Sequence, residues 1–208
     1  MMGLPASRKH RRLLTPEVIQ PSATDCGVAS LKSFLSGFHF QVDYEALREF
    51  CHTDVDGTSI DVIEDLAVRF GLDAQQVLVP MDNLFHPDAR AQPAIIVTTL
   101  PDGANHFIVL WRSVGTWVQV MDPGQGRRWL PRERVLEQVY EHSMALPATR
   151  WREWAGTEEF VGPLSDRMLA VGLPSSATVR LLQAALDDSR WQALAGLDAA
   201  TRLVASFV

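Results

Sequence analysis

One cysteine lies where a polar loop gives way to an amphipathic helix, and this junction constrains the fold more than any other stretch. The segment Gln20–Ser30 reads QPSATDCGVAS. Thr24 and Asp25 are residue types that cap helices, and apolar residues then recur at helical spacing as far as Leu35. Cys26 is therefore expected in the first turn of a helix, where backbone N–H groups and the helix dipole stabilise a thiolate.

A thiolate is the reactive form of a cysteine nucleophile, so this position suits covalent catalysis. Gln20 precedes the cysteine in the same loop, and its side-chain amide can donate a hydrogen bond to a developing oxyanion. A single cysteine on a helix is nevertheless more often a small buried hydrophobic residue. The catalytic hypothesis therefore requires a base elsewhere in the chain and a group that orients that base.

Composition narrows the classes of function. The chain has 208 residues, of which 47% are hydrophobic, and a formal net charge of -6. These values suit one globular domain with an appendage, and the charge argues against nucleic-acid binding. The basic cluster within residues 8–12 is interpreted as part of a solvated arm, with contact to a membrane surface or a partner as the alternative.

Several sequence features are absent, and their absence suggests a compartment. No apolar run reaches the ~18 residues of a membrane helix, and no secretory segment follows the first Met. The two cysteines do not resemble a disulfide framework, and no Walker-type nucleotide-binding motif is present. We therefore expect a cytoplasmic chain with free thiols and no membrane-spanning segment.

The first half of the chain predicts three helices. The first runs from Cys26 to Gly37, and the second is capped by Asp43 and carries Cys51 on its buried face. The third follows a turn at residues 56–57, is capped by Thr58 or Ser59, and ends at Gly71. The segment around this turn does not fit a calcium-binding EF-hand, because histidine and isoleucine would occupy its first and last ligand positions.

The pattern then changes to that of strands. Predicted strands cover residues 76–79, 94–98, 107–112, 116–121 and 127–130, with a loop at 81–91 and a helix at 131–140. An antiparallel meander that follows three helices is an α+β arrangement. Residues 151–208 are rich in Ala, Leu and Asp, are interrupted at Leu173-Pro174, and predict two to four short helices.

A base and its orienting group lie within the predicted sheet. His106 begins one strand and Asp122 ends the next, and in an antiparallel pair these two ends are neighbours. An aspartate that accepts a hydrogen bond from one imidazole nitrogen leaves the other nitrogen to take the proton of the thiol. Taken singly, such a histidine is usually a surface residue, and Asp-Pro-Gly usually forms only a turn. Together with Cys26 and Gln20 they occupy four catalytic roles in one consistent topology.

Four segments resemble the bacteriocin-processing double-glycine peptidases. They are QPSATDCGVAS, GTSID from Gly57, NHFIVL from Asn105 and VMDPGQG from Val120. This resemblance covers about residues 15–147 and implies a papain-like cysteine peptidase, usually the cytosolic N-terminal domain of a peptidase-containing ABC exporter. The expected organisation is a flexible arm (1–14), a peptidase domain (15–147) of N-terminal helices packed on an antiparallel sheet, and an all-helical C-terminal extension or linker (148–208).

The resemblance also implies roles. Cys26 would be the nucleophile, His106 the general base and then the general acid, and Asp122 the residue that orients His106. Gln20 and the backbone N–H of Cys26 would form the oxyanion hole. The substrate would be the leader of a ribosomally made peptide, cut after a Gly-Gly or Gly-Ala type pair because a narrow cleft rejects larger side chains. No metal or organic cofactor is implied.

The leader would dock through the apolar stripe of a helix. The expected partners are this leader peptide and the membrane and nucleotide-binding domains of an ABC exporter, in the same chain or a separate one. The apolar final segment favours an N-terminal portion of an exporter over a free-standing peptidase. Two other functions stay open. One is a non-cleaving module that binds leaders, and the other is a papain-like transferase or deamidase with the same catalytic residues.

Overall fold

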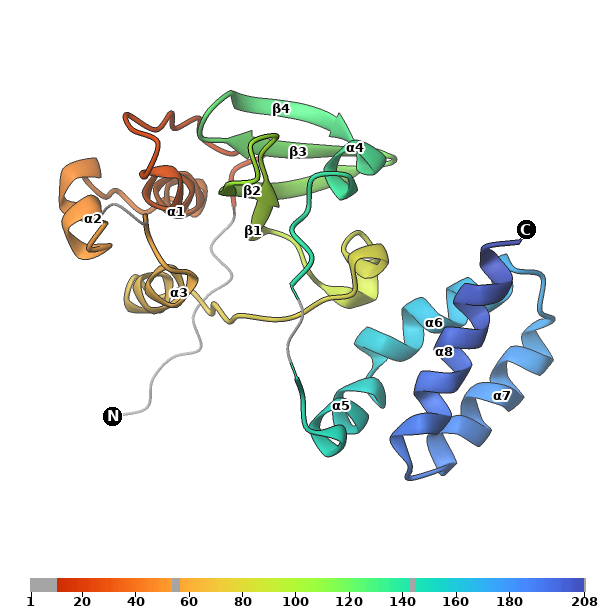
Figure 1. Ribbon diagram of the computed structural model, residues 1–208. Helices are drawn as coiled ribbons and strands as arrows, with labels where there is room; N and C mark the ends of the chain where they lie inside the picture. The colour runs from red at the N-terminus through yellow and green to blue at the C-terminus, as the bar shows by residue number, and fades with distance from the viewer. Residues whose placement is uncertain (1–10, 54–56, 143–144, 208) are drawn as a thin grey trace. The chain divides into compact units, whose positions relative to one another are not determined.

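Two compact units make up the chain in the computed structural model, which describes residues 11–53, 57–142 and 145–207. The first unit comprises Met1–Met81 and Gln92–Glu141, and the second comprises Asp82–Ala91 and His142–Val208. The first unit is an α+β domain with helices beside an antiparallel sheet, and the second is helical (Figure 1). The predicted fold class is therefore confirmed.

Three helices form the first part of the α+β unit, as predicted. They are α1 (Cys26–Gly37), α2 (Tyr44–Phe50) and α3 (Ile60–Arg69). Asp43 caps α2 by accepting from two backbone N–H groups, and Ser59, rather than Thr58, caps α3. The turn predicted at residues 56–57 begins at Asp56, which lies outside the described residues.

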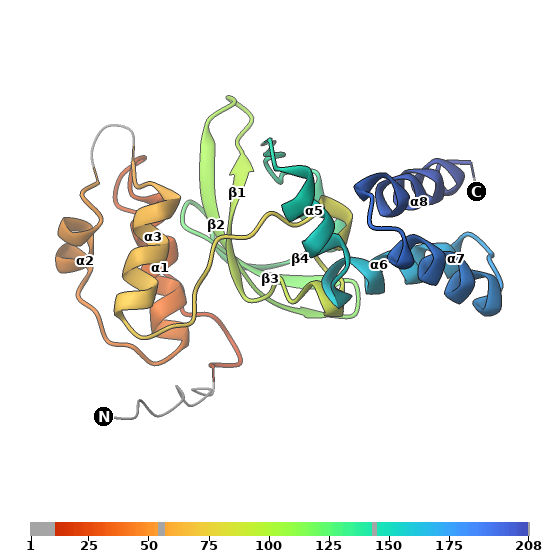
Figure 2. The same ribbon diagram turned by 90° about the horizontal axis from the view of Figure 1, so that it is seen from below.

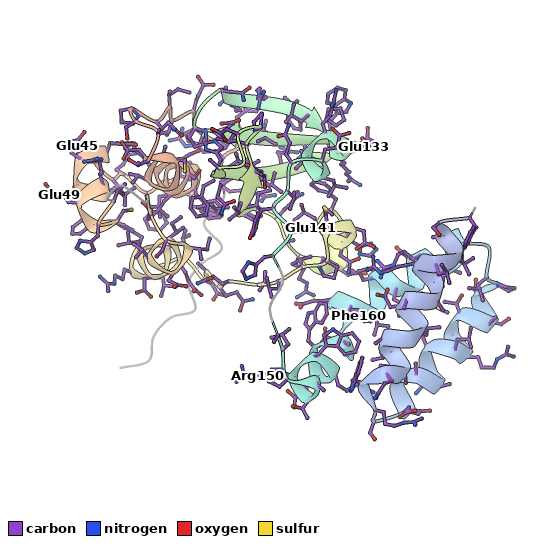
Figure 3. The ribbon with its side chains drawn as sticks, viewed as in Figure 1. Glu45, Glu49, Glu133, Glu141, Arg150 and Phe160 are labelled. Atoms are coloured by element: carbon purple, nitrogen blue, oxygen red, sulfur yellow. The ribbon has the colours of Figure 1, made fainter. Side chains whose placement is uncertain are left out.

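An apolar core joins these helices. Glu45 and Glu49 project from the outer side of α2, whereas the opposite side of this helix faces the core (Figure 3). Cys51 belongs to the core and is only 2% exposed, which confirms its predicted place. The buried members of the cluster are Val28, Leu31, Leu35, Leu47, Cys51, Ile63, Leu66 and Ala67.

The sheet is an antiparallel meander of four strands in the order β1-β2-β3-β4. Its strands are β1 (Ala94–Thr99), β2 (Asn105–Val114), β3 (Trp117–Asp122) and β4 (Gly126–Pro131). The helices α1 and α3 lie on one side of this sheet, and α1 packs against β2 (Figure 2). The helix predicted at 131–140 forms but is shorter than predicted, since α4 spans Arg132–Leu136.

The strand predicted at residues 76–79 does not form, so that prediction is wrong. The backbone N–H of Gln76 donates to Glu64 at 3.1 Å, and its side chain donates to Asp61 at 2.7 Å, both on α3. Val77 and Leu78 are exposed. The segment therefore lies along a helix instead of pairing with the sheet. The loop predicted at 81–91 contains two short 3₁₀ helices, η1 (Met81–Asn83) and η2 (Pro87–Ala89).

Trp111 ties the sheet to α1 and to the start of the described chain. Its ring lies against Phe34 and Phe38 with centroids 5.8 and 5.4 Å away, and its indole N–H donates to the carbonyl of Arg12 at 2.9 Å. Arg11 donates in return to the Trp111 carbonyl at 3.1 Å. Residues 11 and 12, assigned to a flexible arm in the sequence analysis, are thus bound to the domain.

Gly37, at the end of α1, leaves room for this ring. A Cβ atom there would lie 2.3 Å from Cη2 of Trp111, whose side chain is fully buried. Replacing Gly37 with alanine is therefore expected to lower the free energy of unfolding by about 2 kcal/mol, because the ring or the helix must shift. Urea denaturation measures this change. Gly196→Ala in the last helix is the control, since a Cβ meets no atom within 4 Å there and is expected to stabilise by about 0.5–1 kcal/mol. Equal midpoints for the two variants would contradict the prediction.

Four α-helices follow residue 145 in the described part of the second unit, in agreement with the predicted two to four. They are α5 (Ala148–Ala155), α6 (Glu158–Ala170), α7 (Ser175–Asp187) and α8 (Trp191–Ala205). Phe160 of α6 points in among these helices (Figure 3), where its ring lies near Trp151 and Trp154. Leu164, Met168 and Leu194 complete the centre of this core.

The segment Asp82–Ala91 belongs to this helical unit, although the sequence analysis placed it within the peptidase domain. Arg167 of α6 donates to Asn83 at 2.5 Å and to Asp198 of α8 at 2.7 Å. His86 lies 2.8 Å from Asp166 of α6. A piece of chain from the middle of the sequence is thus fastened to the C-terminal helices by polar contacts. Within the described ranges, no helix combines the length and apolar character needed to cross a membrane.

Candidate active site

Cys26 is the first residue of α1, where the sequence analysis expected it. Asp25 occupies the N-cap position, but its side chain does not cap the helix. The carboxylate of Asp25 accepts instead from Nε of Arg48 on α2 at 3.0 Å, and Asp25 is only 1% exposed. The backbone N–H groups of the first turn therefore stay free of a side-chain cap beside the thiol.

His106 and Asp122 lie together at one edge of the sheet. His106 is the second residue of β2 and Asp122 is the last residue of β3. Nε2 of His106 lies 3.0 Å from Oδ1 of Asp122, and both side chains are buried. The same carboxylate oxygen accepts from the backbone N–H of Gly124 at 2.8 Å. With Nε2 engaged in this way, the other ring nitrogen of His106 is available to the thiol.

The electrostatics of Cys26 and His106 favour an ion pair. Burial raises the pKa of the Cys26 thiol, but hydrogen bonding to His106 and to the backbone of Phe107 and Gly27 outweighs it, so the pKa falls below its ordinary value. Hydrogen bonds to Asp122 and then to Cys26 raise the pKa of His106 to about 9. A thiolate beside an imidazolium is the reactive form of a cysteine-histidine pair.

Asp122 remains ionised in this arrangement. Burial raises the pKa of its carboxyl group, but the hydrogen bonds from His106 and from the backbone of Gly124, together with the charge of Arg128, bring the pKa below its usual value. An ionised aspartate stabilises an imidazolium on His106, and this explains why the pKa of the histidine is raised.

The loop that carries Gln20 is attached to the turn after Asp122. The backbone N–H of Gln20 donates to the carbonyl of Pro123 at 3.0 Å. Its side-chain oxygen is buried and makes no hydrogen bond in the described part of the protein. The Gln20 side-chain oxygen is therefore not held by a structural hydrogen bond. The backbone hydrogen bond to Pro123 attaches the loop before α1 to the turn that follows Asp122.

One charged neighbour of Asp122 was not expected from the sequence. Arg128 of β4 donates through Nη2 to Oδ2 of Asp122 at 3.1 Å. The antiparallel register pairs Asp122 with Gly126 and Val120 with Arg128. Because side chains alternate between the two faces of a strand, this register places Arg128 on the same face as Asp122. The sequence pattern contained the alternation but did not define the register of the hairpin.

The described side chains do not form a ligand set of the kind that holds a metal ion. Across residues 11–53, 57–142 and 145–207, no group of three or more His, Cys, Asp or Glu side chains is arranged to hold a metal ion. The polar groups that converge are a thiol, an imidazole and a carboxylate, the set used in nucleophilic acyl transfer.

Comparison with known proteins shows the family of this chain. The model of the peptidase C39 family matches residues 15–150. The chain belongs to the peptidase C39 family. This C39 domain is a cysteine peptidase domain, and the match covers the three helices, the sheet and all four candidate residues, Gln20, Cys26, His106 and Asp122.

Curated relatives of the C39 domain are much longer proteins. The chain is 24% identical over 149 residues to the lactococcin-G-processing and transport ATP-binding protein LagD of Lactococcus lactis subsp. lactis, covering 72% of this chain and 19% of that protein. It is 26% identical over 147 residues to the probable microcin-H47 secretion/processing ATP-binding protein MchF of Escherichia coli, covering 71% and 19%. The chain thus spans about a fifth of the length of these relatives.

Solved structures match the same part of the chain. A double glycine motif protease from an AMS/PCAT transporter, solved in complex with the leader peptide, is 25% identical with a TM-score of 0.53, and the match covers 64% of this chain and 89% of that one. The peptidase domain of Streptococcus ComA, a bi-functional ABC transporter, matches with 23% identity and a TM-score of 0.54 over 60% of this chain and 92% of that one. The papain-like fold is therefore confirmed.

Proposed function

We propose that this C39 domain removes the leader from ribosomally made secreted peptides by cutting after a double-glycine-type pair. The observation that carries the proposal is the buried contact of 3.0 Å between Nε2 of His106 and Asp122. This contact leaves Nδ1 of His106 available to the thiol at the start of α1. The names of LagD, MchF and the double glycine motif protease support the choice of substrate.

The chemistry proceeds through a thioester. The thiolate of Cys26 attacks the carbonyl carbon of the scissile bond, and the side-chain amide of Gln20 and the backbone N–H of Cys26 stabilise the resulting oxyanion. The imidazolium of His106 gives its proton to the departing amine as the C–N bond breaks. Water then attacks the thioester while His106 accepts its proton, and the thiolate leaves with the leader released as a carboxylate. Asp122 holds His106 in the required orientation throughout.

The proposed setting is the cytoplasmic side of a membrane, beside an ABC exporter that carries the released product. The exporter's membrane and nucleotide-binding domains, in the same or a separate chain, would be the partners. No metal or organic cofactor takes part in the proposed steps, because Cys26, His106 and water supply every proton and bond that changes.

A cleavage assay with a synthetic leader peptide tests the proposal. The purified protein is incubated with a leader that ends in a Gly-Gly junction, and the products are identified by mass spectrometry. We expect a single cut after the pair, and a loss of at least about 100-fold in rate when the two glycines are replaced by leucines, because a narrow cleft excludes larger side chains. Cutting at many sites without small residues would indicate a general peptidase. Saturable binding without cleavage would indicate a leader-binding module, and transfer of an acyl group to an added amine would indicate a transferase.

A further inference from the structure

The carboxylate of Asp122 is held by donors from three parts of the chain. Its Oδ1 atom accepts from Nε2 of His106 at 3.0 Å and from the backbone N–H of Gly124 at 2.8 Å. Its Oδ2 atom accepts from Nη2 of Arg128 at 3.1 Å. A carboxylate held at one oxygen can still turn about its Cβ–Cγ bond, whereas a carboxylate held at both oxygens is fixed in orientation.

The guanidinium of Arg128 is itself held at its other end. Nη1 donates to the side-chain oxygen of Gln125 at 2.5 Å, and Gln125 lies in the turn between β3 and β4. The backbone N–H of Gln125 donates to the carbonyl of Asp122 at 3.1 Å. Gln125, Arg128 and Asp122 thus form a closed ring of hydrogen bonds, and Asp122 is the member of this ring that contacts His106.

In the described part of the chain, charged groups from three elements interact with His106 or Asp122. Cys26 approaches from α1, Asp122 from β3 and Arg128 from β4. The neighbouring carboxylates are bound elsewhere, because Asp25 pairs with Arg48 and Glu17 accepts from the backbone N–H of Arg127 at 2.9 Å. Among the described residues, Asp122 forms its ion pairs with His106 and Arg128.

We propose that Arg128 is a positioning residue that, with Gln125, fixes the Asp122 carboxylate in the orientation that accepts from His106. This inference rests on the proposed function, in which Asp122 orients His106. The side chain of Arg128 is 34% exposed against 9% for Asp122, so solvent screens the guanidinium charge and the orientation of its hydrogen bond is the larger effect.

The positioning effect and a purely electrostatic effect differ in sign. If Arg128 acted only through its charge, removing it would raise the pKa of His106, since a nearby cation disfavours the imidazolium. If Arg128 orients Asp122, removing it weakens the Asp122–His106 hydrogen bond, which is the largest cause of the raised pKa of His106. The pKa of His106 then falls from about 9 toward its ordinary value.

The test uses the full chain, and its first readout needs no peptide. The rate at which iodoacetamide alkylates Cys26 is measured against pH for the wild type, Arg128→Met and Gln125→Ala, and His106→Gln identifies the step in this profile that belongs to the histidine. We expect this step to move down by about half to one pH unit in Arg128→Met, and by less in Gln125→Ala, which keeps the charge. The cleavage kcat is expected to fall about 10-fold in Arg128→Met, with KM changed less than 2-fold.

Arg134→Met is the control, because it removes an exposed arginine that pairs with Glu137 and is expected to leave the profile unchanged. An upward or absent shift in Arg128→Met, or a wild-type profile in Gln125→Ala, overturns the positioning role. Gln125 is exposed, so this second variant decides the question even if Arg128→Met fails to fold. A wild-type profile without any step that His106→Gln removes contradicts the proposed function itself.

Discussion

Replacing Cys26 with alanine is expected to lower kcat/KM for leader cleavage by a factor on the order of 10⁵, because no thioester can form and water alone must attack the peptide bond. Cys26 starts α1, and the pKa of its thiol lies below the ordinary value. The rate is measured by mass spectrometry of the products. Leader affinity, measured by titration, is expected to change less than about 3-fold, since the substitution removes one small side chain.

Cys51→Ala is the matched control for this prediction. Cys51 is 2% exposed in the core, and burial raises the pKa of its thiol to about 11, so it stays a neutral thiol. This variant is expected to keep near wild-type kcat/KM and to lose no iodoacetamide labelling, whereas Cys26→Ala loses it. Persistent cleavage by Cys26→Ala, or labelling that depends on Cys51, would show that the nucleophile lies elsewhere.

His106→Gln is expected to lower kcat by a factor on the order of 10³, because both the proton donor for the departing amine and the partner of the thiolate are lost. Burial of Cys26 remains in this variant while the hydrogen bond that lowers the pKa of its thiol is removed. The pKa of the thiol therefore rises, and alkylation by iodoacetamide at pH 6 is expected to slow at least about 10-fold. His86→Gln is the control, since His86 pairs with Asp166 in the helical unit.

The pH profile of the wild-type enzyme follows from the same two shifts. Activity is expected to rise as Cys26 loses its proton, at a pH below the ordinary range of a thiol, and to fall as His106 loses its proton at about pH 9. The proton on His106 is needed to expel the amine, so the high-pH limb belongs to the histidine. Activity that keeps increasing above pH 10 would contradict the ion-pair assignment.

Local sequence was sufficient for elements whose residues agree with one another. The apolar spacing after Cys26, the caps at Asp43 and Ser59 and the alternation along β3 each depend on neighbours in the chain, and the predicted helices and strand formed there. The same patterns failed where a distant group competed. The segment at Gln76 has the composition of a strand, but carboxylates on α3 accept its hydrogen bonds.

Asp25 shows the same competition at the active site. Its residue type and position predicted a helix cap. Its carboxylate instead accepts a hydrogen bond from Arg48, which lies on the next helix, α2. No local pattern contains this choice, because it depends on how α1 and α2 pack. The link from Arg167 to Asn83 is likewise invisible in the sequence, since the two residues are separated by the entire sheet.

Local sequence was enough to place each residue of the candidate site within its own element: a cysteine at a helix start, a histidine at a strand start and an aspartate at a strand end. Helix and strand periodicity are local properties, so these positions follow from short stretches of chain. Three features were visible only in the folded protein: the 3.0 Å contact between His106 and Asp122, the hydrogen bond from Arg128 to that aspartate and the attachment of Asp82–Ala91 to the C-terminal helices. These depend on strand register and helix packing, which are settled by the burial of apolar surface across the whole fold.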